Sequence, residues 1–219
     1  MPVQTDFDDI VTLPPYTIEV YKSIGSAYQY VDGQIHTLAL NITGGAIMEC
    51  TATVHARTVN HVAKATASYI DADPFTWNET SLSVGATGNG EFESATITIT
   101  NPIEGVVTLN GTKTEAKLKR SGFRTITITG DQDFANQTEY NAFRQQSRRR
   151  FIFSITGDSI GGGNNNFISI DAPQVNYTSF GFPIAGAGRI TASYEGNCEF
   201  DTSSSYAARI TVQNTQTSY

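Results

Sequence analysis

This 219-residue sequence carries unusually little charge, and the charge it has is mostly negative. Charged side chains make up 16% of the chain, with 14 Lys and Arg against 21 Asp and Glu, which gives a formal net charge of −7. Proteins that grip nucleic acid need clustered Lys and Arg to neutralise phosphates. The composition therefore argues against a nucleic-acid-binding protein, and a surface so poor in charge suits a subunit that buries much of itself against neighbours.

Cysteine and long apolar runs are also scarce. Cys50 and Cys198 are too few for a disulfide framework. Each falls on the apolar side of an alternating segment, so we expect two buried thiols, with a disulfide bridge as the alternative. No stretch approaches the ~20 apolar residues of a membrane span. Residues 1–9 lack the basic and apolar regions of a signal peptide, so we expect no membrane partner and assembly in a cytoplasm.

The residues that an enzyme or a metal centre would need are missing or badly spaced. The only histidines are His36, His55 and His61, whereas a metal site needs three or four converging ligands. Neither G-x-S-x-G nor H-E-x-x-H occurs, and the glycines at 161–163 lack the Lys-Ser/Thr of a phosphate loop. We therefore expect no catalytic residues, no metal and no cofactor.

What the sequence does contain is period-two alternation of apolar and polar residues. It is clearest over residues 48–57, 95–100, 125–129, 189–198 and 208–213, and shorter segments at 16–22, 35–42, 150–156 and 166–171 also fit strands. Such alternation predicts antiparallel strands with one packed face. Thr is the preferred polar residue, where a face that meets only water would more often carry Lys and Glu. The predicted fold class is all-β, an antiparallel β-sandwich.

One segment has helical spacing instead. Asn136 and Glu139 resemble a capping box, and Tyr140 and Phe143 follow on one face. We predict one helix over residues 137–148. The arginines at its end are interpreted as a helix C-terminal cluster or as ion-pair donors to another subunit, in preference to phosphate ligands.

The stretch from 60 to 93 is long and weakly periodic. We interpret it as a loop or hairpin excursion from one domain that spans residues 1–219, and excursions of this length usually carry function. Tyr69, Phe75 and Trp77 make it too aromatic to remain in solvent. We therefore predict that these three residues contact another subunit.

Several segments together resemble the tail tube proteins of long-tailed bacteriophages of the siphophage type. TITITNPIE at residues 96–104 and RSGFRTITITG at 120–130 are similar to two strands of that family, the second preceding its helix. The other matching segments are residues 16–19, 34–42, 45–54, 172–177, 188–196 and 208–212. The glycine-asparagine run at 161–166 and the length of the 60–93 excursion depart from the family pattern, so the resemblance does not identify the loop that stacks the rings.

The resemblance implies a β-sandwich flanked by one helix, assembled as hexameric rings whose inner sheets join into a central β-barrel. Stacked rings would form the conduit for DNA ejection, and DNA would pass without specific binding. Tyr69, Phe75 and Trp77 are the candidate contacts between rings. Expected partners are further copies of the chain and other tail proteins, namely the tape measure, terminator and distal tail proteins. The expected location is the virion tail, assembled in the cytoplasm of the host bacterium.

Two polar stripes are the candidates for the surface that faces the lumen. Each lies opposite an apolar stripe and must meet water or a neighbour; an interface or outer position is the alternative. Carboxylates there would repel phosphate and keep DNA moving. The candidate residues are Glu49, Thr51, Thr53 and His55 on one strand, and Thr191, Ser193 and Glu195 on the other.

Two other functions fit parts of the sequence. Asn-x-Thr triplets occur at 41, 78, 110, 136 and 176, and in a secreted protein they would accept glycans. With Trp77, Phe75 and Asn78 as a sugar platform, they suit a secreted or surface β-sandwich that binds carbohydrate or acts as an adhesin. Another virion role, such as a decoration or tail terminator protein, is the third reading.

Overall fold

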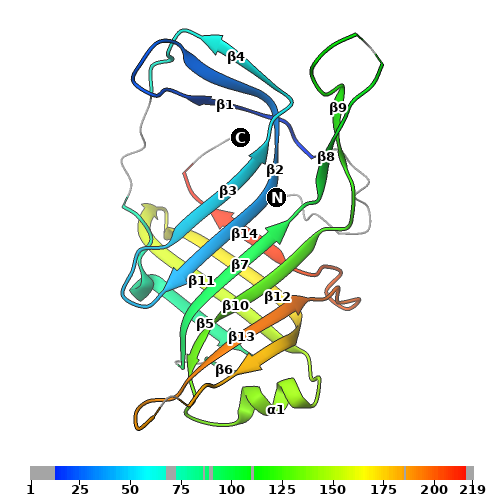
Figure 1. Cartoon of the computed structure of the whole chain (residues 1–219). Coiled ribbons are helices and arrows are strands. Elements are labelled where there is room, and N and C mark those ends of the chain that lie inside the picture. The colour runs from blue at the N-terminus through cyan, green and yellow to red at the C-terminus, as the bar shows by residue number, and fades with distance from the viewer. Residues whose placement is uncertain are drawn as a thin grey trace.

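The alternating segments form a single 12-stranded antiparallel sheet that bends into two layers. The computed structural model describes residues 13–67, 73–85, 91–109, 111–184 and 186–215, and the backbone of 87 and 88. The strand order is β1-β2-β7-β10-β13-β12-β11-β5-β6, with β3 and β4 also paired to β2 and β14 paired to β12 (Figure 1). The antiparallel all-β prediction is confirmed, and α1 is the one α-helix among the described residues.

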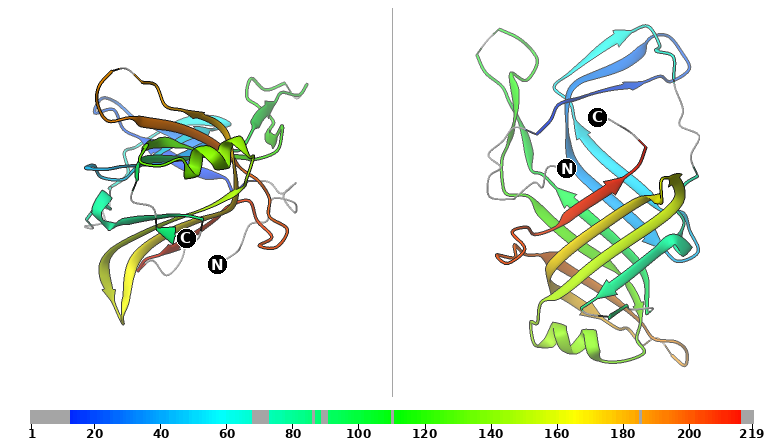
Figure 2. Two further views of the ribbon diagram at one scale, coloured as in Figure 1. Left: turned by 90° about the horizontal axis from the view of Figure 1, so that it is seen from below. Right: turned by 180° about the vertical axis from the view of Figure 1, so that it is seen from behind.

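The front layer in Figure 1 contains five strands, and the back layer crosses behind it, as Figure 2 shows from two further sides. The front strands are β3 (Glu49–His55), the C-terminal half of β2 (Ala27–Thr43), β7 (Phe92–Thr100), β10 (Thr125–Asp133) and β13 (Thr191–Cys198). The back strands are β14 (Arg209–Gln213), β12 (Asn164–Gly181), β11 (Arg149–Gly161), β5 (Thr80–Val84) and β6 (Thr87–Gly88).

Two projections extend from one end of the sandwich. The first, which we call the arm, is made of β1 (Tyr16–Val20), β4 (Thr58–Val62) and the N-terminal half of β2. The second, which we call the ribbon, comprises residues 102–124 and contains the separate two-stranded sheet of β8 (Ile103–Val106) and β9 (Lys117–Arg120). Both lie at the top of Figure 1, opposite α1 (Thr138–Arg144).

The core between the layers is aromatic and aliphatic. Phe151, Phe153 and Tyr177 from the back layer are fully buried, as is Ile128 from the front. The rings of Phe151 and Tyr177 meet edge to face, with 6.0 Å between their centroids, whereas those of Phe151 and Phe153 are stacked. The sheet turns from front to back between β13 and β12, where a Cβ on Gly196 would come within 2.7 Å of Val175, so this corner accepts only glycine without displacement.

The predicted helix is shorter than expected and is capped differently. It ends at Arg144, since Gln146 already has a positive φ of 53°. Asn136 accepts a hydrogen bond from the backbone of Thr138, but Glu139 does not return to the cap. Its carboxylate is buried and accepts hydrogen bonds from Arg149 and from the hydroxyl of Tyr177, because the sheet beneath the helix offers it stronger donors.

The arginines after the helix form ion pairs within their own subunit. Arg148 binds Glu199 at 2.8 Å, Arg149 binds Glu139 at 2.7 Å, and Arg150 binds Asp171 at 2.8 Å. Arg149 and Arg150 belong to β11, not to the end of the helix. The expectation of a helix C-terminal cluster or of inter-subunit donors was therefore wrong, because carboxylates of the same subunit, on α1, on β12 and just after β13, already pair with these arginines.

The cysteines also differ from the expectation of two buried thiols. They form no disulfide with each other; Cys50 is exposed and Cys198 is half-buried. Alternation placed Cys50 on the apolar side of β3 correctly, but no layer of the described residues covers that side, and Ala52 beside it is exposed as well. A strand pattern reports which residues share a face, not whether something lies over it.

The stretch from 60 to 93 divides into parts with different positions. Residues up to 62 belong to β4 in the arm, and residues 80–84 form β5, which pairs with β11 in the main sheet. Between them, the backbone of Phe75 accepts a hydrogen bond from Met48 at 2.9 Å, and η1 (Trp77–Glu79) follows. Among the described residues, no helix is long and apolar enough to cross a membrane.

Candidate functional site

The two predicted polar stripes lie on the same face of the same sheet. β3 and β13 are the outer strands of the five-stranded front layer, and their polar residues continue across β2, β7 and β10 in cross-strand rows. One row runs Thr53, Thr37, Thr100, Thr125; the next runs Thr51, Ala39, Thr98, Thr127, Asn197; the third runs Glu49, Asn41, Thr96, Thr129, Glu195; the fourth runs Thr43, Ser94, Asp131, Ser193. We call this surface the threonine face.

The threonine face is held together by hydrogen bonds between its side chains. The hydroxyls of Thr96 and Thr43 both donate to the side-chain amide oxygen of Asn41, at 3.2 and 3.4 Å. Ser193 donates to Asp131 at 2.6 Å. Contacts of this kind between strands stabilise a sheet and fix the side chains of its surface. The face therefore presents hydroxyl groups in defined positions.

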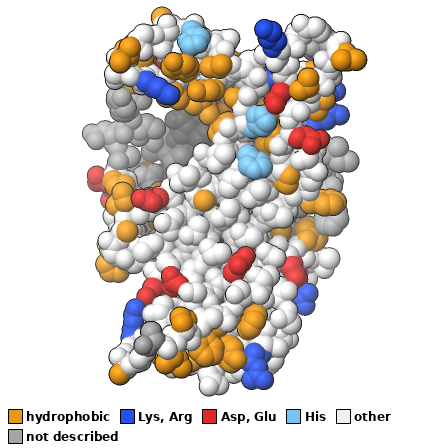
Figure 3. Space-filling model, in the orientation of Figure 1, with side chains coloured by type: hydrophobic (Ala, Val, Ile, Leu, Met, Phe, Trp, Pro, Cys, Tyr) orange, Lys and Arg blue, Asp and Glu red, His pale blue; other side chains and the backbone are white. Residues whose placement is uncertain are grey.

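The charges on the threonine face are of one sign, apart from His55. Its four rows contain Glu49, Asp131 and Glu195 and no Lys or Arg. Two of these carboxylates, Glu49 and Glu195, stand at opposite ends of the third row. Figure 3 views this face directly, and its middle is mostly white, with isolated red side chains. Within these rows the face repels phosphate weakly and offers it no cation; Arg57 and Arg189, which continue the two stripes, pair with Asp32 and Glu93.

His55 has a structural role at the edge of the threonine face. Its Nε2 lies 3.1 Å from the carboxylate of Glu115, which belongs to the ribbon. Beside it, Arg57 donates to the backbone oxygen of Ala116 at 3.1 Å and pairs with Asp32 in the arm. These contacts join the ribbon to β3 and the arm. The remaining members of the two stripes, including Thr191 and Ser193 on β13, lie on the same open side of the sheet. That this side faces a lumen stays a prediction.

The three aromatic residues of the 60–93 excursion differ in position and burial. Tyr69 lies outside the described residues. Phe75 is partly buried in its own subunit, where a Cβ on Gly157 would come within 2.7 Å of its ring. Trp77 is 53% exposed and borders a groove of about 540 Å³ that is also lined by Ile42, Phe92 and Phe153, between the front and back layers. Trp77 is thus the described member of the set that remains available to a neighbour.

The exposed underside of β3 opens into a second groove. It has a volume of about 660 Å³ and is lined mainly by apolar side chains of β1, β2 and β3, among them Ile18, Val20, Ala52 and Val54. Ala52, exposed on this side of β3, lines the groove. Figure 3 shows hydrophobic side chains gathered beneath the arm.

The ribbon is the feature that the sequence reasoning missed. Residues 102–124 contain five basic and two acidic side chains, a net charge of +3 in a chain of −7. Lys113, Lys117 and Lys119 are exposed, and so are Val107 and Leu109 near its tip. The local charge reversal was present in the sequence and would have singled out this segment.

Comparison with known proteins agrees with this geometry. The family described as phage tail tube protein matches residues 4–198. No curated protein matches the chain. The match covers most of the 219 residues and includes every strand of the threonine face. The chain therefore belongs to the phage tail tube protein family.

Proposed function

We propose that six copies of this chain close into a ring, that rings stack into the tail tube, and that the threonine face lines the lumen through which DNA is ejected. Membership of the family makes the chain a structural component of the virion tail. The observation that carries the lumen assignment is the threonine face itself: both predicted stripes share one five-stranded surface whose rows contain no Lys or Arg.

The chemistry of this face suits a conduit. A ring repeats every side chain around its axis, so Glu49 and Glu195 each become a circle of negative charge. Such circles repel phosphate, whereas circles of Lys would hold DNA through release of its counterions. The uncharged threonine hydroxyls keep the surface hydrated and do not attract either strand of the DNA strongly. The face lets DNA move instead of binding it.

Ring closure is supported by the free edge of β3. Among the described residues, β3 pairs with β2 and with no other strand. An unpaired edge exposes backbone donors and acceptors that a strand of another copy can satisfy. Pairing around the axis would join each front layer to the next copy; the partner of β3 would not be β13, whose two edges are already paired with β10 and β12. It would also place a neighbour near the exposed Cys50 and Ala52.

The remaining assignments rest on the same proposal. Trp77 lies half exposed beside the groove between the layers, and we assign it to a contact with a neighbouring copy of the chain. Partners at the two ends of the tube and in its lumen would be the terminator, distal tail and tape measure proteins. Assembly would take place in the cytoplasm of the host bacterium.

Charge reversal tests the lumen assignment in intact tails. We expect Glu49→Lys and Glu195→Lys together to leave tubes intact but slow DNA ejection, because they place cations along the path of the phosphates. Asp158→Lys, on an exposed position of the back layer, is the matched control and should eject normally. Normal ejection from well-formed double-variant tails would refute the assignment, and failed assembly would place these residues between subunits.

The tube itself is tested separately with the wild-type chain. Negative-stain images and sedimentation should show rings or tubes as concentration rises. A protein that stays monomeric at high concentration, even with the other tail proteins present, would refute the tube proposal. Trp77→Ala should weaken assembly while leaving the folded subunit stable.

A further inference from the structure

We infer that the ribbon is the device that joins successive rings, and that it docks on the opposite, helix-bearing end of a second copy of this chain. The inference rests on the proposed function and adds to it the contact between rings. It replaces the 60–93 excursion as the connector, since part of that excursion is a strand of the sandwich wall.

The ribbon is positioned rigidly enough to act as a docking element. At its base, the Asn101 backbone donates to His36 at 2.7 Å, and Ser121 donates to Pro102 at 3.0 Å. Along its length, Glu115 contacts His55, and Ala116 accepts a hydrogen bond from Arg57. These contacts come from β2, β3 and the segment between β3 and β4, so the ribbon is braced from the sandwich and need not be ordered at the moment of docking.

The free part of the ribbon carries both an apolar tip and positive charge. Val107 is 73% exposed and Leu109 is fully exposed, which is unusual for side chains of this size. Lys113, Lys117 and Lys119 flank them and are exposed too. Among the described residues, no carboxylate forms an ion pair with these three lysines. The ribbon therefore suits a partner that is apolar at its centre and acidic around it.

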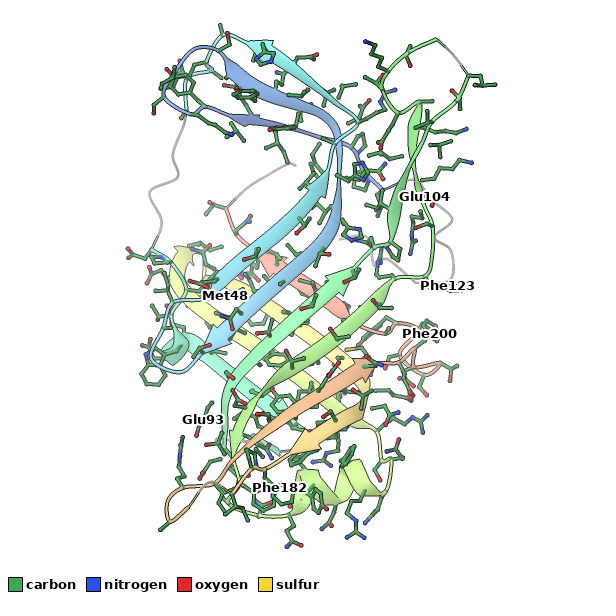
Figure 4. The ribbon with its side chains drawn as sticks, viewed as in Figure 1. Met48, Glu93, Glu104, Phe123, Phe182 and Phe200 are labelled. Atoms are coloured by element: carbon green, nitrogen blue, oxygen red, sulfur yellow. The ribbon has the colours of Figure 1, made fainter. Side chains whose placement is uncertain are left out.

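A second copy of the chain offers such a surface at its far end. We call it the helix-end surface and define it by Glu91, Glu93, Asp133, Phe182 and Ile184. Ile184 is 71% exposed, and Phe182 stacks on Phe134 with 4.7 Å between ring centroids. Figure 4 labels Glu93 and Phe182 at this end and Glu104 and Phe123 at the ribbon end.

Arg189 pairs with Glu93 and lies 3.9 Å from Asp133, so it offsets part of the acidic charge of the helix-end surface. The net charge of the rest of the chain still favours a second copy as the partner of the ribbon. With the ribbon at +3 and the whole chain at −7, the remainder of each copy carries −10. The net negative charge of the remainder therefore attracts a basic ribbon at long range.

The placement of the two surfaces fixes the kind of assembly. The ribbon and the helix-end surface lie at opposite ends of the long axis in Figures 1 and 2. When a surface fits a different surface on an identical molecule, the contact is head-to-tail and repeats without limit unless it closes. Contacts between opposite ends propagate along an axis, which is the geometry of stacked rings.

Charge reversal of the ribbon is the first test. In Lys113→Glu/Lys117→Glu/Lys119→Glu, we expect rings to form as in the wild type but the critical concentration for tube growth to rise at least about tenfold, because like charges then meet in the contact. Lys22→Glu/Lys64→Glu, which changes lysines of the arm, is the control and should polymerise normally. Tubes that grow normally from the ribbon variant would overturn the inference without affecting the tube proposal, and so would an equal defect in the control.

Cross-linking identifies the surface that the ribbon touches. In a Cys50→Ser/Cys198→Ser background, Leu109→Cys and Ile184→Cys should be joined between copies by a short bismaleimide in tubes and not in isolated rings. Val59→Cys, exposed on the arm at the ribbon end, is the matched alternative to Ile184→Cys. Links from Leu109→Cys to Val59→Cys alone would show a contact between like ends and overturn the inference.

A nucleic-acid partner for the ribbon is excluded or revealed by one further measurement. Fluorescence anisotropy of a short labelled DNA duplex at low salt should show no difference between the wild type and the triple ribbon variant. Loss of DNA binding in a variant that still stacks would assign the ribbon to DNA and overturn docking between rings.

Discussion

The buried contact between α1 and the back layer gives the sharpest test of the fold. The Glu139 side chain is 2% exposed and accepts hydrogen bonds from Arg149 at 2.7 and 3.1 Å and from the Tyr177 hydroxyl at 2.8 Å. Removing one partner of a buried ion pair costs about 3–5 kcal/mol, because the other charge loses its compensation. Arg149 is partly exposed and water can reach it, so we expect Glu139→Ala to cost about 3 kcal/mol.

The size of that loss is measurable on the isolated subunit. For a chain of this length, 1 kcal/mol shifts Tm by about 2–4 °C, so Glu139→Ala should lower Tm by roughly 6–12 °C. Tyr177→Phe removes one hydrogen bond and keeps the ion pair, and we expect about 1–2 kcal/mol. Glu104→Ala, an exposed position on the ribbon, should stay within about 0.5 kcal/mol.

Denaturant unfolding of the wild type, the three single variants and the Glu139→Ala/Tyr177→Phe double variant completes a double-mutant cycle and separates the contributions. A loss below about 1 kcal/mol for Glu139→Ala would refute the claim that this contact holds the helix on the sheet. A larger loss for Tyr177→Phe than for Glu139→Ala would place the stabilising contact on the tyrosine instead.

Three further outcomes are expected. Gly130→Ala should destabilise the subunit by about 1–3 kcal/mol in thermal unfolding, since its Cβ would lie 2.1 Å from the backbone oxygen of Ser94, whereas Gly181→Ala, with open space, should not. Burial alone would raise the pKa of Asp171, but hydrogen bonds from an arginine and a tyrosine outweigh it and hold the pKa below the ordinary 3.8. Its stabilising effect is therefore complete above pH 3.8 and is lost as the pH falls through the lower folded value, and acid unfolding of the Asp171→Asn variant should show a weaker dependence there. Cys50, exposed on the subunit, should react readily with a maleimide in monomers and slowly in tubes; equal rates in both would argue against coverage of β3 by a neighbour.

The strands were predictable because alternation is a local property. The Thr-Ile repeats at 96–100 and 125–129 each specify a strand with one polar face, and both lie within observed strands. Which strands become neighbours was not predictable, because pairing joins segments far apart in sequence. The sequence alone could not show that Glu49 and Glu195 would end the same row, with three intervening strands between them.

The errors share one physical cause, competition from partners that are distant in sequence. Glu139 has the spacing of a capping residue, but Arg149 and Tyr177 bind it more strongly than the helix end does. The arginines at 148–150 follow the helix, but their carboxylates come from three separate segments, α1, β12 and the residue after β13. Cys50 alternates like a core residue, and the layer that would cover it is absent from the described part of the subunit. Local pattern proposes a role, and tertiary contacts decide it.

The length of β2 has a mechanical consequence. This one strand spans residues Ala27–Thr43 and pairs with β1 and β4 in the arm, then with β3 and β7 in the sandwich. A register shift between Ile35 and Thr37 marks the bend, yet the backbone is continuous through it. A force on the arm is therefore transmitted into the front layer along the covalent backbone of β2. The hydrogen bonds from β2 to β3 and β7 then carry that force as shear. In the proposed tube, a load on the arm would therefore reach the threonine face through this one strand.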